Sequence, residues 1–219
     1  FVTAGFIIGF DSERQSVADA MVQFVEDCAI PIAMVGLMYA LPNTQLTRRL
    51  AKEGRLHADA DLQPDGVGDQ CTAGINFDPL RPKLDILRDY LTVIETVYRA
   101  DRYFGRVARV GKHLDSRGRR YKPGLKRWAK ELRGFVRMAA RMTADPRARG
   151  PFWSTFMGGL IRNPRSIRYI GMMCGLYVHF GPFSEFVASR IRMAIQQAER
   201  EPASAPVSLP PSAFRPTVT

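Results

Sequence analysis

The first 56 residues alternate between two hydrophobic spacings. Short apolar runs occur at 6–8, ending at Gly9, and at 32–38, and both are typical of buried strands. Between these runs, apolar side chains recur every three or four residues and predict a helix; they are Val17, Ala20, Met21, Phe24, Val25 and Cys28. Ser12 and Gln15 suggest a capping box at its start. A further helix is expected over 45–53, capped by Thr44 and closed by Gly54. Strands that alternate with helices predict a parallel α/β unit.

Beyond this unit the hydrophobic spacing is helical. Residues 57–80 are rich in Asp, Gly and Pro and predict a long loop. Helical faces follow over 84–98, 103–114, 125–142 and 183–198, while 151–180 predicts two shorter helices that break near Asn163-Pro164. The segment 202–219 contains 5 Pro in 18 residues and predicts a disordered tail. The predicted fold class is therefore α/β followed by α, with 1–56 as the α/β part and 81–201 as a helical extension.

Charge is concentrated in one segment of this extension. The chain of 219 residues has a formal net charge of +11, and residues 101–170 alone contain 19 basic and 4 acidic side chains. Three explanations stay open: a solvated basic face, attraction to anionic lipid headgroups, or contact with the phosphates of RNA or DNA. The absence of a nucleic-acid module signature favours lipid over nucleic acid. The expected contact residues are Arg119, Arg120, Lys126 and Arg127.

The cysteines and histidines show no metal-ligand spacing. Cys28, Cys71 and Cys174 are far apart in the sequence, and so are the three histidines. Neither a disulfide framework nor a metal site is therefore predicted in this chain. The chain starts at Phe1, directly in a predicted strand. We expect from this start that it is the C-terminal part of a longer polypeptide, whose upstream domains would be its first partners.

Two short motifs lie at the ends of the predicted strands. Residues 5–13 form the string G-x-I-x-G-x-x-x-E, and residues 40–46 form A-L-P-x-T-x-L. At these motifs the sequence resembles the radical S-adenosylmethionine (SAM) enzymes, over the last strands of their (β/α) barrel. The family form places its Glu one residue earlier than Glu13. It also usually has Gly where Asn43 stands, and Asn tolerates the same left-handed backbone conformation.

A narrower resemblance covers residues 1–105. The runs 33–37, 52–56 and 76–79 are similar to those of cobalamin-binding radical SAM proteins that carry an uncharacterised C-terminal extension. Relatives in this group include enzymes that methylate hydrophobic membrane lipids such as hopanoids. The resemblance implies a cobalamin-dependent methyltransferase acting on a hydrophobic or lipid-like substrate. A radical SAM tRNA-modifying enzyme, and a non-catalytic basic helical module that binds anionic membrane or nucleic acid, are the alternatives.

The resemblance also implies where SAM would bind. Gly5 and Gly9 would let the adenine approach the strand backbone, and Ile7 would offer it an apolar surface. Residues Met38, Ala40 and Leu41 would lie nearby, because parallel strands place their ligands at their carboxyl ends. Asn76 and Phe77 are candidates for contacts with the substrate, and a local Asx-turn is the alternative for this segment.

The same resemblance implies a [4Fe–4S] cluster and reductive cleavage of SAM to a 5′-deoxyadenosyl radical. A cluster of this kind needs closely spaced thiolates. Since Cys28, Cys71 and Cys174 lack that spacing, the cluster ligands are expected upstream, and this fragment is expected to be inactive alone. Residues 1–56 would be the end of the barrel. The expected localisation is cytoplasmic, with peripheral contact to the inner membrane face as an extension of the lipid hypothesis.

Overall fold

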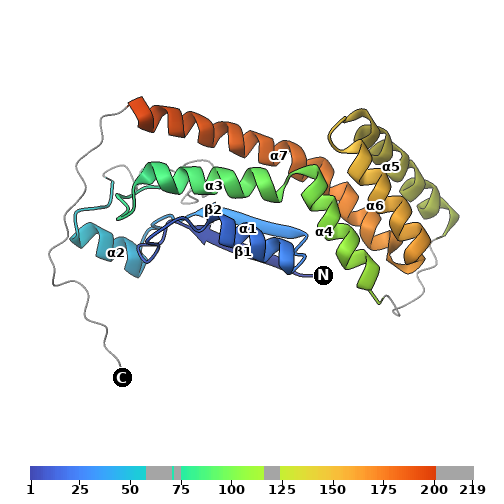
Figure 1. Cartoon of the computed structure of the whole chain (residues 1–219), viewed down its shortest axis with the longest axis horizontal. Coiled ribbons are helices and arrows are strands. Elements are labelled where there is room, and N and C mark those ends of the chain that lie inside the picture. The colour runs from blue at the N-terminus through green and yellow to red at the C-terminus, as the bar shows by residue number, and fades with distance from the viewer. Residues whose placement is uncertain (58–70, 72–74, 116–123, 201–219) are drawn as a thin grey trace, which may run out of the picture.

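Two parallel strands form the sheet of the described chain. The computed structural model describes residues 1–57, 71, 75–115 and 124–200, without the side chains of Leu125, Lys126 and Trp128 (Figure 1). Strand β1 (Thr3–Ile8) pairs in parallel with β2 (Ile32–Leu37), in a register that runs from Thr3↔Ile32 to Ile8↔Leu37. Helix α1 (Ala18–Asp27) connects them. The predicted α/β unit is therefore confirmed.

The two faces of this sheet differ in burial. Alternate residues point to opposite faces, and one face contributes Ile8, Ala33, Val35 and Leu37 to a core shared with helix α3 (Lys83–Val97). On the other face Met34 is 64% exposed and Ile7 is 42% exposed. The apolar run 32–38 is typical of a strand that is buried on both sides, and this expectation is wrong for the second face.

Helix α1 starts later than the sequence pattern suggests. The proposed capping box at Ser12 and Gln15 is wrong, because the helix begins at Ala18 and its N-cap, Val17, provides no side-chain cap. By contrast, the expected cap of α2 (Gln45–Lys52) is confirmed: the Thr44 hydroxyl accepts a hydrogen bond from the Thr47 amide at 3.2 Å. Local capping signals therefore succeeded for one helix and failed for the other.

The second half of the chain is helical. Helices α4 (Ala100–His113), α5 (Leu125–Ala144) and α6 (Arg149–Arg162) enclose a second core, with a short 3-10 helix η1 (Pro164–Ser166) before α7 (Ile167–Arg200). The predicted break at Asn163-Pro164 is confirmed. Gly159 allows close packing at this point, because a Cβ there would lie 2.1 Å from Cδ1 of Ile170.

Helix α7 joins the two cores. Its first half contributes Ile170, Met173 and Cys174 to the helical core, and its second half contributes Val187 and Ile191 to the sheet core. Figure 1 shows it alongside both parts of the molecule. The expectations of a second short helix within 151–180 and of a separate helix over 183–198 are wrong, since α7 runs from Ile167 to Arg200 and continues through Pro182. An internal proline costs about 3 kcal/mol, and packing against both cores offsets this cost.

A buried arginine also connects the two parts. Arg106 of α4 is fully buried and donates to the carbonyls of Ile30 at 2.8 Å and Val97 at 2.6 Å. Its third partner is the Glu26 carboxylate of α1, at 2.5 Å. Desolvation lowers the pKa of Arg106, and the charge and hydrogen bond of Glu26 counteract part of this shift. Arg106 thus fixes α4 against the crossover between β1 and β2.

Candidate functional site

The carboxyl ends of β1 and β2 meet at one edge of the sheet, as parallel pairing requires. The Met38 amide donates to the Ile8 carbonyl at 2.7 Å, which holds the segment after β2 beside the end of β1. Of the predicted residues there, Ala40 is buried, Met38 is half-buried and Leu41 is 39% exposed. The motifs at 5–13 and 40–46 therefore lie at the same edge of the sheet, although Gly9 and Ala40 are 31 residues apart in the sequence.

Gly5 and Ile7 lie on the exposed face of the sheet. Their strand partners are Met34 and Gly36, so this face offers a narrow apolar surface interrupted by two glycines. A Cβ built on Gly5 would meet no atom of the described chain within 4 Å. The arrangement leaves room beside the β1 backbone for a flat group.

Gly9 has a different role. Its φ of +107° lies in the region that favours glycine. An added Cβ would lie 3.4 Å from the Cβ of Met38 and 3.5 Å from the Cγ2 of Ile86. Gly9 is buried, so it turns the chain at the end of β1 and packs against the protein rather than presenting an open surface.

The amides after β1 are already occupied. The Glu13 carboxylate accepts hydrogen bonds from the amides of Gly9, at 3.0 and 3.1 Å, and of Phe10, at 3.1 Å. Glu13 thus closes the turn after β1, although it stands one residue later than in the motif it resembles. These two N–H groups are not available to the edge of a bound ring, so amides further along the edge would have to serve.

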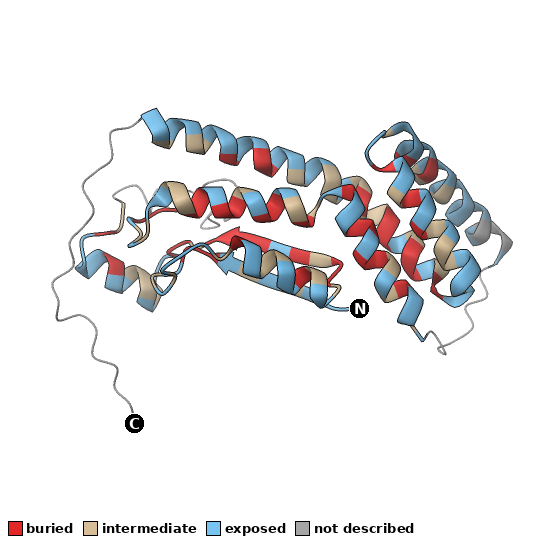
Figure 2. Cartoon of the chain, in the orientation of Figure 1, coloured by how far each residue is buried: buried red, intermediate tan, exposed pale blue. Residues whose placement is uncertain are grey.

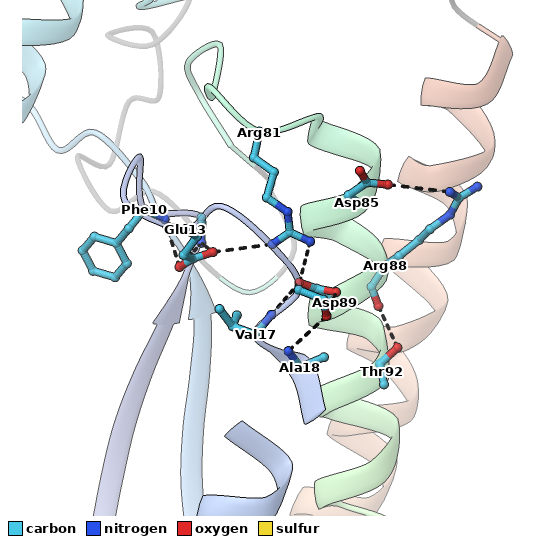
Figure 3. A network of polar contacts seen from close by, with 11 residues as sticks. Phe10, Glu13, Val17, Ala18, Arg81, Asp85, Arg88, Asp89 and Thr92 are labelled. Atoms are coloured by element: carbon cyan, nitrogen blue, oxygen red, sulfur yellow. Dashed lines mark hydrogen bonds and ion pairs between the residues drawn. The ribbon is translucent and has the colours of Figure 1, made fainter. Parts of the chain in front are cut away.

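Asp89 of α3 and Arg81, just before this helix, support the turn after β1, and Figure 3 shows the network. The Arg81 guanidinium lies 3.7 Å from the Glu13 carboxylate and 2.7 Å from the Asp89 carboxylate. Asp89 also accepts from the Ser16 hydroxyl at 2.7 Å and from the Val17 amide at 3.2 Å, and so caps α1 from outside the helix. The network links the β1 turn, the start of α1 and α3.

Sequence reasoning missed Arg81 and Asp89. A signal for Asp89 was present, because it is a charged residue between Ile86 and Val93 on the apolar face of α3. Charged groups are rarely buried without a partner, so such a position indicates a polar contact across the core. The sequence pattern did not identify the partner, since Ser16 lies 73 residues away.

Asn76 fixes the backbone at Ala40. Its side-chain oxygen accepts from the Ala40 amide at 2.8 Å, and its side-chain nitrogen donates to the Ala40 carbonyl at 3.0 Å. This long-range clamp uses both ends of the carboxamide. Phe77 is 1% exposed and forms an isolated bridge with Leu56. The structure thus places both residues at the sheet edge, with Asn76 engaged by the loop after β2. Contact of either residue with a substrate stays a prediction.

The left-handed backbone predicted for Asn43 is confirmed by its φ of +64°.

An ion cluster ties the neighbouring loops together. Arg55 is buried and bonds to Asp11 at 2.7 Å, to Glu53 at 2.8 Å and to the Asp78 carbonyl at 2.7 Å. Burial tends to raise the pKa of Asp11, but the hydrogen bond and charge of Arg55, with the charge of Arg49, lower it overall. The loops after β1, after α2 and before α3 therefore converge in a fixed arrangement.

Two of the four candidate anion-binding residues, Lys126 and Arg127, belong to α5. Arg119 and Arg120 fall outside the described residues, as does the predicted disordered tail at 202–219. Lys126 belongs to the first turn of α5, and Arg127 is exposed with its guanidinium 3.3 Å from the Glu131 carboxylate.

Thiols and other metal ligands do not gather in the described part. Across residues 1–57, 71, 75–115 and 124–200, no three His, Cys, Asp or Glu side chains are grouped to hold a metal ion. Cys174 is buried in the helical core, and burial raises the pKa of its thiol to about 12. Such a thiol stays protonated near neutral pH and is a poor metal ligand. The described cysteines therefore do not fit an iron–sulfur cluster.

Comparison with known proteins identifies the family. The model of a domain of unknown function, DUF4070, matches residues 44–193. The protein named "Uncharacterized methyltransferase sll1242", of Synechocystis sp., is 32% identical over 193 residues, which are 86% of this chain and 34% of that protein. The hopanoid C-2 methylase of Rhodopseudomonas palustris is 40% identical over 58 residues, which are 26% of this chain and 11% of that protein. No solved structure matches.

This chain spans about a third of the length of the Synechocystis protein. The matches confirm the predicted resemblance to a group with an uncharacterised C-terminal domain and hopanoid-methylase-like members. The DUF4070 match begins at Thr44, the N-cap of α2, and extends into the second half of α7. The chain therefore belongs to the DUF4070 family.

Proposed function

We propose that this chain is the C-terminal part of a radical SAM methyltransferase, with a hydrophobic or lipid-like substrate. The names of the two relatives support a methyl-transfer role. The observation that carries the proposal is the parallel pairing of β1 with β2, which leaves Gly5 and Ile7 on an uncovered face beside the ends of both strands. A barrel built from further strands would direct this face inward, since α3 packs against the other one.

The residues of this face fit the adenine of SAM. Gly5 leaves the β1 backbone open, Ile7 offers an apolar contact, and the exposed Met34 borders both. Because Glu13 occupies the amides of Gly9 and Phe10, the ring edge would be read by the peptide groups that follow β2. Asn76 engages both the N–H and the carbonyl of Ala40, so its role would be to hold the loop after β2 in place beside the ring. When bound, SAM would supply the methyl group or the radical chemistry of the reaction.

The other cofactors are assigned to parts outside this chain. The described residues provide no thiolate set for a [4Fe–4S] cluster, and none of them is identified as a cobalamin ligand. We therefore propose that the strands of this chain hold one side of SAM and that its helices cover the space where the reaction takes place. Exclusion of water from that space is the contribution that a protein makes to chemistry performed by a cofactor.

Gly5→Val, made in the full-length protein that contains this chain, tests the proposal. The added Cβ meets no atom of the described residues within 4 Å, so the fold should persist while the space for adenine is filled. We expect at least a tenfold loss of SAM affinity, measured by isothermal titration. Thr3→Val is the matched control, because Thr3 lies on the same face of β1 at the other end of the strand.

The control variant should bind SAM like the unmodified protein. Circular dichroism and the unfolding midpoint would verify that both variants fold normally. A folded Gly5→Val protein that retains full SAM affinity would refute the placement of adenine on this face.

A further inference from the structure

A strip of exposed apolar residues runs along helices α5 and α6. On α6, three exposed apolar residues follow Trp153 by four, seven and eight positions, and this spacing places all of them on one side of the helix. Their exposure ranges from 37% at Trp153 to 78% at Ile161. The members of this apolar strip are Leu132, Val136, Trp153, Met157, Leu160 and Ile161.

The two helices present these residues on the same side. Helices α5 and α6 are joined by a short connection and run in opposite directions (Figure 1). They touch where the rings of Phe135 and Phe156 lie 4.8 Å apart. Helices α5 and α6 are right-handed and antiparallel. In such a pair, the residue that follows the contact residue points to the same side of the helix–helix contact in both helices. Val136 and Met157 hold these positions, so the two halves of the strip are continuous across the seam.

A row of basic residues borders this strip on α5. Lys130, Arg133, Arg137 and Arg141 are all exposed, and their spacing places them on one side of the helix. Glu131, the one acidic residue of α5, lies beside Arg127. In the part of the chain that the structure describes, these four basic side chains form no ion pair. The row is thus an uncompensated positive charge next to an exposed apolar surface.

We propose that the apolar strip and the basic row form a peripheral binding surface for anionic lipid bilayers. The strip would enter the interface between headgroups and acyl chains, with Trp153 at the boundary, while the basic row would contact the headgroups. Among the described residues no helix has a stretch apolar and long enough to cross a membrane. The surface therefore lies on the bilayer, and it is separate from the proposed SAM site on the sheet.

Charge and apolarity together select this partner. A duplex or a single strand of nucleic acid would satisfy the basic row, but its phosphates would not cover Leu160 and Ile161. A second copy of the chain would cover the apolar strip, but its own basic row would meet a surface of like charge. An anionic bilayer complements both features at once.

The test is flotation of the chain with vesicles of phosphatidylcholine, alone or mixed equally with phosphatidylglycerol. We expect binding to the mixed vesicles and weak binding to phosphatidylcholine alone. The double variant Arg133→Gln/Arg137→Gln should lower the partition coefficient on mixed vesicles by roughly 30-fold, at about fivefold per charge. Its matched control is Arg190→Gln on α7, where the side chain is exposed and lies outside the basic row.

A second pair of variants tests the apolar strip. Leu160→Glu/Ile161→Glu should reduce partitioning by at least tenfold, whereas Met193→Glu, at a position 50% exposed on α7, should leave it unchanged. Both target residues are exposed, so the fold is expected to persist, and circular dichroism checks this. With Trp128 replaced by Phe, the fluorescence of Trp153 should shift to shorter wavelength on mixed vesicles and be quenched by brominated lipid.

Several results would overturn the proposal. Equal flotation of the double variants and the unmodified chain would show that another surface binds lipid. Binding to RNA that is stronger than binding to mixed vesicles, and that persists in Leu160→Glu/Ile161→Glu, would assign the basic row to nucleic acid. A dimer in solution that dissociates in Leu160→Glu/Ile161→Glu, without lipid binding, would make the strip a contact between copies.

Discussion

The two halves of the molecule use their charged residues in opposite ways. Around the sheet, Asp11, Glu13, Arg55, Arg81 and Asp89 bond to one another and to the backbone, and thereby fix the loops at one edge. The basic row on α5 is exposed next to exposed apolar residues. In Figure 2, buried residues lie along α3 and β2. We propose that the network positions a site and that the exposed surface contacts an anionic bilayer.

Burial explains why the two halves differ. In the sheet half, Asp89 and Arg55 lie in the interior, where an unpaired charge would be costly. Each must therefore find a partner, and the pairs that result also order the loops. The four cations of the basic row on α5 are exposed to water, where a charge does not require a protein partner.

The largest effect is expected where the two halves meet. Replacing Arg106 by Ala would leave Glu26 and the carbonyls of Ile30 and Val97 without their shared donor. We expect the free energy of unfolding to fall by about 3–5 kcal/mol, as measured by urea denaturation. Arg109→Ala is the control, because Arg109 pairs with the same Glu26 but is 49% exposed at its side chain. Its loss should cost under about 1 kcal/mol, and equal losses in the two variants would contradict the assignment.

An intermediate effect is expected at the support of the β1 turn. Asp89→Asn weakens the contact with Arg81 and the external cap of α1, so the free energy of unfolding should fall by about 1–3 kcal/mol. Hydrogen exchange should also accelerate at the amides of Gly9, Phe10 and Val17. Asp85→Asn serves as the control, since Asp85 makes an exposed ion pair with Arg88 at 3.8 Å. If the amides of the β1 turn keep their protection in Asp89→Asn, this turn does not depend on α3.

The smallest effect is a pH dependence of the sheet half. Arg55 and Arg49 outweigh desolvation and depress the pKa of Asp11 in the folded chain. A depressed carboxyl pKa contributes stability that is present above its unfolded value of 3.8 and is lost as the pH falls through the folded value. Unfolding at pH 7 and at successively lower pH should show this loss below about pH 4. Asp11→Asn should remove that part of the pH dependence, and an unchanged profile would contradict the role of Asp11.

Much of the fold was predictable because local patterns determine it. The alternation of apolar runs and helical faces predicted the β–α–β order. Turn and cap chemistry predicted the helix cap at Thr44, the left-handed backbone at Asn43 and the helix break at Asn163-Pro164. The candidate site was predictable in part, since parallel pairing brings the ends of β1 and β2 together. Two features of the site were not predictable from the sequence. The exposed face of the strands depends on how the helices pack against the sheet. The amides that Glu13 occupies depend on the backbone path after β1.

Three features were decided by the tertiary structure alone. Helix α7 continues through Pro182 because it packs on both cores, although proline is locally unfavourable in a helix. Helix α1 is capped by Asp89, 72 residues from the amide that it accepts from. The apolar strip is continuous across two helices because Phe135 and Phe156 join α5 to α6. The sequence by itself determined the order of elements, the amount of charge and the motif positions, since these depend on near neighbours. Which side chains are paired and which are exposed to solvent was decided by contacts between distant residues. These contacts depend on how the whole chain packs.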